Sequence, residues 1–308
     1  MTDASVEVAA EVMAALTAGR PVVALESTVI AHGLPWPMNL ETARAAEAAA
    51  RAEGAVPATV AVWRGRPTVG LSAEQLEGLA RSRGTAKASR RDLAAAVAGR
   101  RTAATTVAAT AALAHRAGIR LFATGGIGGA HRDALQPWDI SADLVELSRT
   151  PIAVVCAGAK SILDLPRTLE ILETLGVPVV GYRTDSFPAF YLHSSGLPVP
   201  ARVDTPAEAA AVLTAHWQLG GGGVVLAQPV APEVAVDPAT WDQALAEAER
   251  QAAASGVRGP ALTPFLLARL AEITQGQTLR ANHALVVANA RLAAQVAAAY
   301  LRADTGHA

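Results

Sequence analysis

The chain has a single cysteine and few aromatic residues. Of its 308 residues, one is cysteine and 4% are Phe, Trp or Tyr. A lone cysteine cannot form an intramolecular disulfide and argues against a structural zinc site. Cys156 lies in an apolar stretch, where a buried thiol usually acts as a small hydrophobe and not as a nucleophile. The hydrophobic content of 51% therefore comes mainly from Ala, Val and Leu, which favour close packing of helices on a sheet.

The chain also lacks strong charge and long uninterrupted apolar runs. Its formal net charge is −1 and only 17% of its residues are charged. With no basic run, there is no electrostatic case for nucleic acid or for an anionic membrane surface. No apolar stretch of membrane-spanning length is free of interruption, and residues 1–7 lack the basic start of a signal peptide. We therefore expect a cytoplasmic protein with neither nucleic-acid nor membrane partners.

Strand-like and helix-period segments alternate along the chain. This alternation predicts an α/β fold, a three-layer α/β/α sandwich with a largely parallel central sheet. We expect one domain over residues 1–302, a disordered tail over 303–308 and a mobile flap at 188–204. Strands are expected at 21–25, 56–63, 66–69, 120–124, 151–157, 177–182 and 223–227. Helices are expected at 6–18, 40–53 with Asn39 as cap, 72–83, 89–97, 105–117, 163–175, 207–218, 241–255, 263–273 and 279–301.

Lys160 follows one of these buried strands. Residues 151–157 are small or β-branched, and Gly158 and Ala159 end the run. Desolvation at the mouth of a buried strand favours the neutral amine, which can attack a carbonyl carbon to form a Schiff base. The alternative is a solvated lysine on a strand-to-helix loop.

Glu26 directly follows another buried strand, at 21–25. Burial favours the protonated carboxyl, so Glu26 is a candidate proton donor. The alternative is a structural carboxylate held by backbone amides. His32, in the Pro-rich loop that follows, is interpreted as an ordering residue more than as a base.

Two further segments suggest anion binding. Lys87 precedes Ser89, a candidate helix cap, and a cation just before the start of a helix fits a phosphate site. The segment fits a solvated helix face equally well. The glycines at 125, 126, 128 and 129 follow a strand and could close backbone amides on an oxyanion or simply form a tight turn. They match neither a Gly-x-Gly-x-x-Gly fingerprint nor a Walker loop, which argues against redox dinucleotides and ATP.

Asp139 and Asp143 stand four residues apart and share a face if the stretch is helical. Oxygen ligands suit Mn²⁺ or Mg²⁺ better than zinc. Alternatively, Asp139 caps a helix over 140–147 and Asp143 is merely exposed. Asn289, in the apolar terminal helix, must find a hydrogen-bond partner if buried, and a structural bond is the simpler interpretation.

Eight ordered segments together resemble the pseudouridine-5′-phosphate glycosidases, the group that includes indigoidine-synthase-A-like proteins. The resemblance extends over residues 22–298. The segments are ALEST (24–28), AHGLP (31–35), KASRRD (87–92), ATTVAA (104–109), FATGGIGG (122–129), DISAD (139–143), VCAGAKSILD (155–164) and TPFLLAR (263–269).

The resemblance implies reversible cleavage of the C–C glycosidic bond of pseudouridine 5′-phosphate to uracil and ribose 5-phosphate, in nucleotide catabolism. It also implies an α/β/α fold, one Mn²⁺ per subunit and a homotrimer. Carried over segment by segment, Lys160 is the Schiff-base nucleophile, Glu26 the proton donor and Asp139 the metal ligand. The expected substrate contacts are Lys87, Val107, Ser141, Ala142 and Asp143. Asn289 is expected to support the site without contacting the substrate directly.

Three positions depart from the family pattern. Arg183 stands where many relatives have Gly, Ala288 where relatives often have a second Asn, and Ala103 where Gly is common. None coincides with Lys160, Glu26 or Asp139. Two alternatives stay open: a Schiff-base aldolase acting on another phosphosugar, and a catalytically silent phosphosugar-binding protein. A sugar kinase is disfavoured because the ATP motifs are missing.

Overall fold

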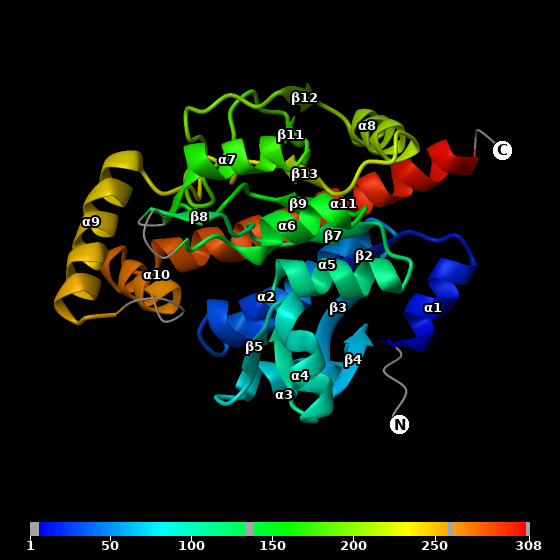
Figure 1. Cartoon of the computed structure of the whole chain (residues 1–308), viewed down its shortest axis with the longest axis horizontal. Helices are drawn as coiled ribbons and strands as arrows, with labels where there is room; N and C mark the ends of the chain where they lie inside the picture. The colour runs from blue at the N-terminus through cyan, green and yellow to red at the C-terminus, as the bar shows by residue number, and fades with distance from the viewer. Residues whose placement is uncertain (1–5, 133–137, 258–261, 306–308) are drawn as a thin grey trace.

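The protein is described here by a computed structural model covering residues 6–132, 138–257 and 262–305 (Figure 1). Its strands are β1 (Glu7–Val8), β2 (Val22–Leu25), β3 (Val56–Trp63), β4 (Arg66–Val69), β5 (Ala86–Ala88), β6 (Ala103–Thr105), β7 (Leu121–Ala123), β8 (Ala130–His131), β9 (Ala153–Cys156), β10 (Leu163–Asp164), β11 (Val179–Tyr182), β12 (Ala201–Val203) and β13 (Val224–Ala227). Its helices are α1 (Ala10–Thr17), α2 (Met38–Ala52), α3 (Ala73–Arg81), α4 (Leu93–Ala98), α5 (Val107–Arg116), α6 (Ala142–Arg149), α7 (Leu165–Thr174), α8 (Pro206–Gln218), α9 (Pro238–Ala254), α10 (Leu262–Ile273) and α11 (Gln277–Thr305). Two short helical turns are η1 (Val29–Gly33) and η2 (Arg90–Asp92).

The main sheet is mixed but mostly parallel, as the alternating pattern predicts. Its strands follow the order β1-β4-β3-β2-β7-β9-β13-β11-β12, and β6 pairs with β3 and with β5. From β3 through β2, β7, β9, β13 and β11 to β12 every neighbouring pair is parallel, whereas β3 is antiparallel to β4 and β6. All residues of β2, β9, β11 and β13 are buried, which fits parallel strands covered on both faces.

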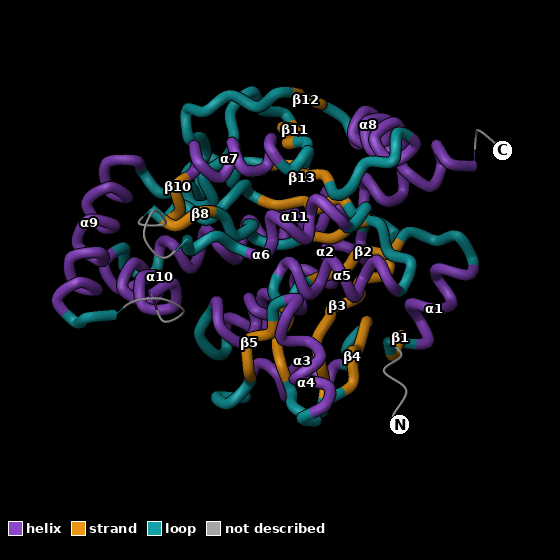
Figure 2. Tube along the Cα trace, in the orientation of Figure 1, coloured by secondary structure: helices purple, strands orange, loops and turns teal. Residues whose placement is uncertain are grey.

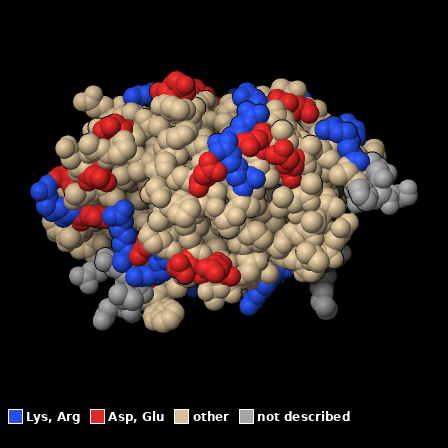
Figure 3. Space-filling model, turned by 90° about the horizontal axis from the view of Figure 1, so that it is seen from above, with Lys and Arg blue, Asp and Glu red and all other residues tan. Residues whose placement is uncertain are grey.

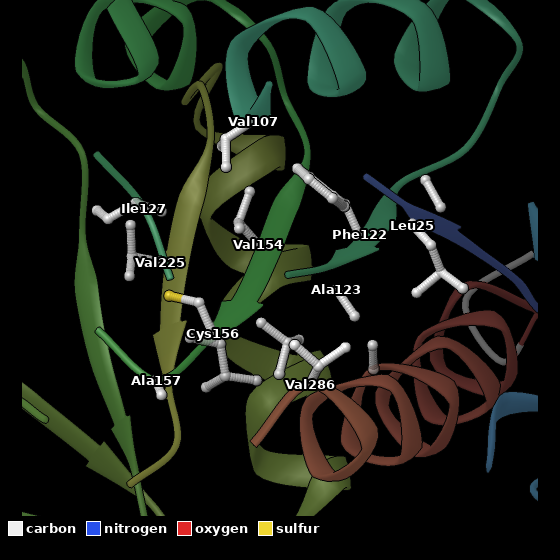
Figure 4. Packing of buried hydrophobic residues seen from close by; sticks show 14 of the residues in the cluster. Leu25, Val107, Phe122, Ala123, Ile127, Val154, Cys156, Ala157, Val225 and Val286 are labelled. Atoms are coloured by element: carbon white, nitrogen blue, oxygen red, sulfur yellow. The ribbon is translucent and has the colours of Figure 1, made fainter. Parts of the chain in front are cut away.

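Helices cover both faces of the sheet. On one face α11 packs against β2, β7 and β9, and it also contacts α2 and α8. On the other face α5 contacts β2 and β3 and packs against α6 (Figure 1). Figure 4 shows the strand side chains between these layers, with Val107 at the start of α5 and Val286 on α11. The larger of two clusters of buried residues draws on the chain from Val12 to Ala297, and the smaller one centres on Leu76 and Leu79. The α/β sandwich is confirmed.

The long helix α11 is a core helix. By length and composition alone it is apolar enough to cross a membrane, but 56% of its most apolar window is buried inside the protein. Its residues Ala290, Ala293, Ala294 and Val296 are fully buried, so its apolar face is already occupied by the sheet and by α2. On the face shown in Figure 3, acidic and basic side chains lie interspersed.

Several local expectations differ from the structure. Helix α11 continues to Thr305, so residues 303–305 of the expected tail are helical, and residues 306–308 lie outside the described part. Helix α2 begins at Met38, with Pro37 as its cap. Asn39 lies instead in the first turn, where Nδ2 donates to the carbonyls of Ile30 at 2.7 Å and Ala80 at 2.9 Å. The proposed flap at 188–204 contains strand β12, and most of it is drawn as loop in Figure 2.

Candidate functional site

A cavity of about 260 Å³ opens at the carboxyl edge of the sheet. Parallel strands end at the same edge, so β2, β7 and β9 deliver Glu26, Gly125 and Lys160 to it. The loop after β9, the segment at 190–191, α10 and α11 close its sides. Its lining residues are Glu26, Thr28, Val29, His32, Gly33, Lys87, Gly125, Gly126, Lys160, Phe190, Tyr191, Thr263, Pro264, Leu267 and Asn282.

Both lysines of the chain line this cavity. The sequence contains only Lys87 and Lys160, the other basic side chains being arginines and histidines. A lysine can lose its proton and act as a nucleophile, whereas an arginine in a protein stays charged. This compositional feature is a signal for the site that segment-by-segment sequence reasoning missed.

The backbone around Lys160 is fixed on both sides of the residue. Its N–H donates to the carbonyl of Ile127 at 3.2 Å, and its own carbonyl accepts from the Leu163 N–H at 3.0 Å. Two residues earlier, Gly158 has φ +75°, and a Cβ there would lie 2.0 Å from the Pro188 carbonyl. The strand therefore ends in a turn that only glycine fits, and the half-buried Lys160 side chain enters the cavity.

Glu26 is 8% exposed, and hydroxyl groups hold its carboxylate. The Thr124 hydroxyl donates to Oε1 and the Thr28 hydroxyl donates to Oε2. The alternative interpretation, a structural carboxylate held by backbone amides, predicts different partners. A hydroxyl can rotate to accept as well as to donate, so these partners can serve both the ionised and the protonated carboxyl. Such surroundings suit a group that takes and returns a proton.

Lys87 lies on β5, a short strand beside β6, which the sequence analysis did not predict. Partial desolvation and then the positive charge of Lys160 lower the pKa of Lys87 below its usual value. The negative charges of Asp143 and Glu26 act in the opposite direction. The pKa of Lys87 is therefore set by its burial and by three neighbouring charged side chains, of which Lys160 and Glu26 line the same cavity.

The glycine turn after β7, at residues 125–129, binds the carboxylate of Asp143. The Gly128 N–H donates to Asp143 Oδ2 at 2.9 Å, and the Ala108 N–H donates to Oδ1 at 2.9 Å. A Cβ at Gly128 would lie 2.3 Å from Ser141 Oγ and 2.8 Å from Asp143 Oδ2. Asp143 is 6% exposed, so the alternative that it is merely exposed is wrong. It ties the starts of α5 and α6 to the glycine turn.

Val107, Ser141 and Ala142 surround this junction. Val107 is the first residue of α5 and is buried. Ser141 caps α6, its Oγ accepting from the Asp143 N–H at 3.2 Å, and Ala142 is the exposed first residue of that helix. Among the described residues these three adjoin Asp143 and do not line the cavity. Their contact with a substrate stays a prediction.

Asp139 lies at the start of the same segment, half-buried. Its carboxylate Oδ2 is 3.9 Å from His131 Nε2, and its carbonyl accepts from the His131 N–H at 3.0 Å. Ser141, not Asp139, caps α6, so the capping alternative for Asp139 is wrong. Over 6–132, 138–257 and 262–305, no three His, Cys, Asp or Glu side chains gather as a metal cage. The donors that are present therefore fit only an ion that keeps most of its waters, as Mg²⁺ and similar hard dications do.

Asn289 and Cys156 lie behind the site. Asn289 is 1% exposed, and its Nδ2 donates to the carbonyl of Thr124 at 2.8 Å, which is the structural bond expected from the sequence. Thr124 in turn holds Glu26. Burial raises the pKa of the Cys156 thiol to about 12, which disfavours a nucleophilic role.

Several cavity residues were not singled out from the sequence. Asn282 lies on α11, four residues after the buried Thr278 and seven before the buried Asn289. Phe190 and Tyr191 come from the segment proposed as a flap, but Phe190 N–H is bonded to the Ala157 carbonyl at 2.8 Å and Ser161 Oγ to the Ala189 carbonyl at 2.5 Å. Partial desolvation is the main cause that lowers the pKa of His32, and Lys87 adds to it.

Comparisons with known proteins identify the family of the chain. The family model described as indigoidine synthase A like protein matches residues 11–299. A protein of Herpetosiphon aurantiacus named pseudouridine-5′-phosphate glycosidase is 57% identical over 292 residues, covering 94% of this chain and 96% of that protein. A protein of the same name from Methylobacterium nodulans is 59% identical and covers 94% of this chain and 87% of its own length.

Two solved structures have the same fold. The prealnumycin C-glycosynthase AlnA, in complex with ribulose 5-phosphate, superposes with a TM-score of 0.91 at 43% identity and covers 99% of both chains. An indigoidine synthase A-like protein from Thermotoga maritima superposes with a TM-score of 0.86 at 36% identity and covers 95% of both chains. The chain therefore belongs to the indigoidine synthase A-like family.

Proposed function

We propose that the protein catalyses reversible cleavage of the C–C glycosidic bond of pseudouridine 5′-phosphate, giving uracil and ribose 5-phosphate. The observation that carries the proposal is the meeting of Lys160 and Glu26 in one cavity, in a chain more than half identical to proteins named for this activity. The complex of AlnA with a five-carbon phosphosugar supports a phosphosugar as the ligand of this fold.

The chemistry needs an amine because a C-glycoside offers no leaving oxygen to protonate. In the cleavage direction a proton from Glu26 on the ribose ring oxygen helps the C1′–O bond to break as Lys160 Nζ bonds to C1′. The new C–N ammonium then loses a proton to the ionised Glu26, which restores the nitrogen lone pair and the protonated carboxyl. The nitrogen lone pair then forms the C1′=N bond as the C–C bond breaks, and the departing uracil carbon takes up a proton. Water hydrolyses the resulting imine, which releases ribose 5-phosphate and restores the amine.

Glu26 is the proton donor in this scheme. It is held beside the cavity by Thr28 and Thr124, whose hydroxyls can serve either protonation state. Lys87 is the cation for the 5′-phosphate, since it is exposed to the cavity and is the second of only two lysines. Val107 and residues 141–143 complete the proposed substrate contacts at the junction around Asp143.

For the metal, we propose Mn²⁺ bound through Asp139, with water as its other ligands. Bound there, the ion would supply a fixed positive charge next to the substrate contacts. Asp139→Ala should abolish the response of activity to added Mn²⁺, and calorimetry should show that Mn²⁺ binding is lost. Full activity of a metal-stripped wild-type enzyme would contradict this role.

We also propose a cytoplasmic homotrimer. The burial of α11 in the core supports a protein that works away from the lipid phase. Light scattering on the purified chain should give three times the mass of one subunit. A monomeric mass at micromolar concentration would overturn the assembly while leaving the catalytic proposal intact.

One assay separates the activity from its alternatives. Pseudouridine 5′-phosphate is incubated with the enzyme, with and without Mn²⁺, and uracil release is measured. Uracil release, together with pseudouridine 5′-phosphate formation from uracil and ribose 5-phosphate, is expected. An aldolase acting on another phosphosugar would form an imine but release no uracil, and a silent binding protein would bind the phosphosugar without turnover.

A further inference from the structure

Arg90 and Glu146 form an ion pair that the proposed chemistry does not yet use. Arg90 Nε is 3.4 Å from Glu146 Oε2, and the Glu146 side chain is 10% exposed. The other oxygen of Glu146, Oε1, accepts from the Thr150 hydroxyl at 2.7 Å. Neither charged side chain is among the described residues that line the cavity. A carboxylate with so little water around it depends on these partners, so the contact links the segment of Arg90 to helix α6.

This pair repeats a relation between charges that is found beside the cavity. Arg90 follows Lys87 by three residues, and Glu146 follows Asp143 by three residues, almost one turn of α6. Desolvation is the main cause that lowers the pKa of Lys87, but the charge of Asp143 opposes this shift, so the two groups lie within electrostatic reach. Two oppositely charged pairs therefore connect the same two segments, one beside the cavity and one outside its lining.

Strand β5, which carries Lys87, is a short edge strand. It has three residues, two of them exposed, and among the described strands it pairs with β6 alone. The turn η2 follows directly, and the Ser89 N–H closes it by donating to Asp92 Oδ2 at 2.9 Å. An anchor on Arg90, inside this tight turn, therefore fixes the backbone from which the Lys87 side chain extends.

We propose that Arg90 and Glu146 are positioning residues for Lys87, holding its segment against α6 so that the Lys87 ammonium meets the 5′-phosphate of the substrate. This inference rests on the proposed function, in which Lys87 is the phosphate contact. Neither residue of the pair touches the substrate or takes part in the bond between Lys160 and the sugar. Both act through Lys87.

The test measures the Kd of the intact enzyme for ribose 5-phosphate by calorimetry. Arg90→Met keeps the apolar stem and removes the charge, and Glu146→Gln keeps the shape and the acceptor for Thr150. Each should raise the Kd about three- to tenfold, half in free energy of the ten- to a hundredfold that loss of a whole charge-assisted contact costs. With pseudouridine 5′-phosphate the KM should rise by the same factor while kcat stays unchanged.

Two arginine variants are the matched controls. The Arg91 side chain, next along the same turn, is 89% exposed and pairs only within the turn, with Asp92 at 3.6 Å, so Arg91→Met should leave the Kd unchanged. Arg90→Lys keeps the positive charge, and the contact with Glu146 is a single one and not a bidentate fork, so lysine should preserve most of the affinity.

A double variant separates positioning from a general structural role. In Lys87→Ala the pair has no ammonium left to position. Adding Arg90→Met to Lys87→Ala should therefore leave the Kd at the value of Lys87→Ala alone, because the two changes remove the same contact. A further loss in the double variant would show that the pair supports the fold in general, and it would overturn the proposal.

The remaining outcomes are equally decisive. A Kd unchanged in both Arg90→Met and Glu146→Gln overturns the proposal, as does an equal loss in Arg91→Met. Wild-type enzyme that binds ribose 5-phosphate but releases no uracil from pseudouridine 5′-phosphate overturns the proposed function alone, and the comparison of Kd values still decides the role of the pair.

Discussion

At the scale of single residues, the site depends on how three titratable side chains are held. Glu26 has hydroxyl partners on both oxygens, and Lys160 is fixed through its backbone between Ile127 and Leu163. Lys87 has the most open position of the three. The proposed proton donor and the proposed nucleophile are therefore preorganised, whereas Lys87, the proposed phosphate contact, keeps more freedom to move.

Replacing Glu26 with Gln should lower turnover by about 10²–10⁴-fold, because the amide keeps the shape and hydrogen bonds of the side chain but cannot deliver a proton. The KM for pseudouridine 5′-phosphate should change little, since the phosphate and base contacts remain. Steady-state kinetics of the variant measure both. Near-normal turnover would show that this carboxylate is structural.

Replacing Lys87 with Ala should lower kcat/KM for pseudouridine 5′-phosphate about ten- to a hundredfold, through loss of one charge-assisted contact of roughly 1.5–3 kcal/mol. Residual action on free pseudouridine should hardly change. Desolvation lowers the pKa of Lys87, so its charge is lost at a lower pH than for an ordinary lysine. In the wild type the KM for the phosphorylated substrate should therefore rise as the pH rises through that lowered pKa. Equal losses on both substrates in the variant would place Lys87 at the reacting carbon.

Site residues that directly follow buried strands could be predicted from the sequence. Those that packing of distant segments places in the cavity could not. Glu26 and Lys160 were predicted as site residues because an apolar run ends just before each. Asn282 enters the cavity from α11, more than 100 residues later in the chain, and no local pattern shows which strand end that helix covers. The position of Phe190 likewise depends on long-range hydrogen bonds: its own N–H donates to the Ala157 carbonyl, and the N–H of the next residue, Tyr191, donates to Ser161 Oγ.

At the scale of elements, the glycine turn at 125–129 connects strand β7 to the site. Each of its neighbours approaches too closely for a side chain: Phe190 at Gly126, Asp143 and Ser141 at Gly128, and Thr168 at Gly129. The sequence suggested an oxyanion site or a tight turn here. The structure instead has the turn packed against an aromatic ring and a buried carboxylate, and close approach explains the glycines.

Gly126→Ala should therefore disturb the cavity, because the new Cβ would lie 2.4 Å from the Phe190 ring. Overpacking of this kind costs about 1–3 kcal/mol, and displacement of Phe190 should also lower activity. Chemical denaturation and uracil release measure the two effects. Gly84→Ala is the control, since no atom lies within 4 Å of a Cβ there, and its stability should stay within about 0.5 kcal/mol. A Gly126→Ala enzyme as stable and active as this control would contradict the packing argument.

The elements that sequence patterns did not predict are the short ones. Strands β5 and β6 have three residues each and consist mostly of Ala, and β8 and β10 have two. Such segments show neither alternation nor a β-branched run, so only pairing with a neighbour makes them strands. The failure to predict β5 matters for the candidate site, because Lys87 lies on that strand.

At the scale of the whole molecule, α11 crosses the middle of the sheet. It contacts α2 on one side and α8 on the other while packing on β2, β7 and β9 between them. Its periodic apolar pattern predicts a long buried helix, but not the strand order beneath it, because many orders bury the same apolar strands equally well. The sheet places β2, β7 and β9 side by side, and this adjacency brings Glu26, the glycine turn and Lys160 together.

The central claim is that Lys160 forms a covalent imine with the sugar, and one measurement tests it most directly. Wild-type enzyme and Lys160→Ala are incubated with ribose 5-phosphate, reduced with borohydride, and mapped by peptide mass spectrometry. Since the chain has only two lysines, the possible side-chain sites are Lys160 and Lys87. The account predicts a reduced ribose-phosphate adduct on Lys160 of the wild type, and none in a folded Lys160→Ala. An adduct on Lys87, or turnover without any adduct, would contradict it.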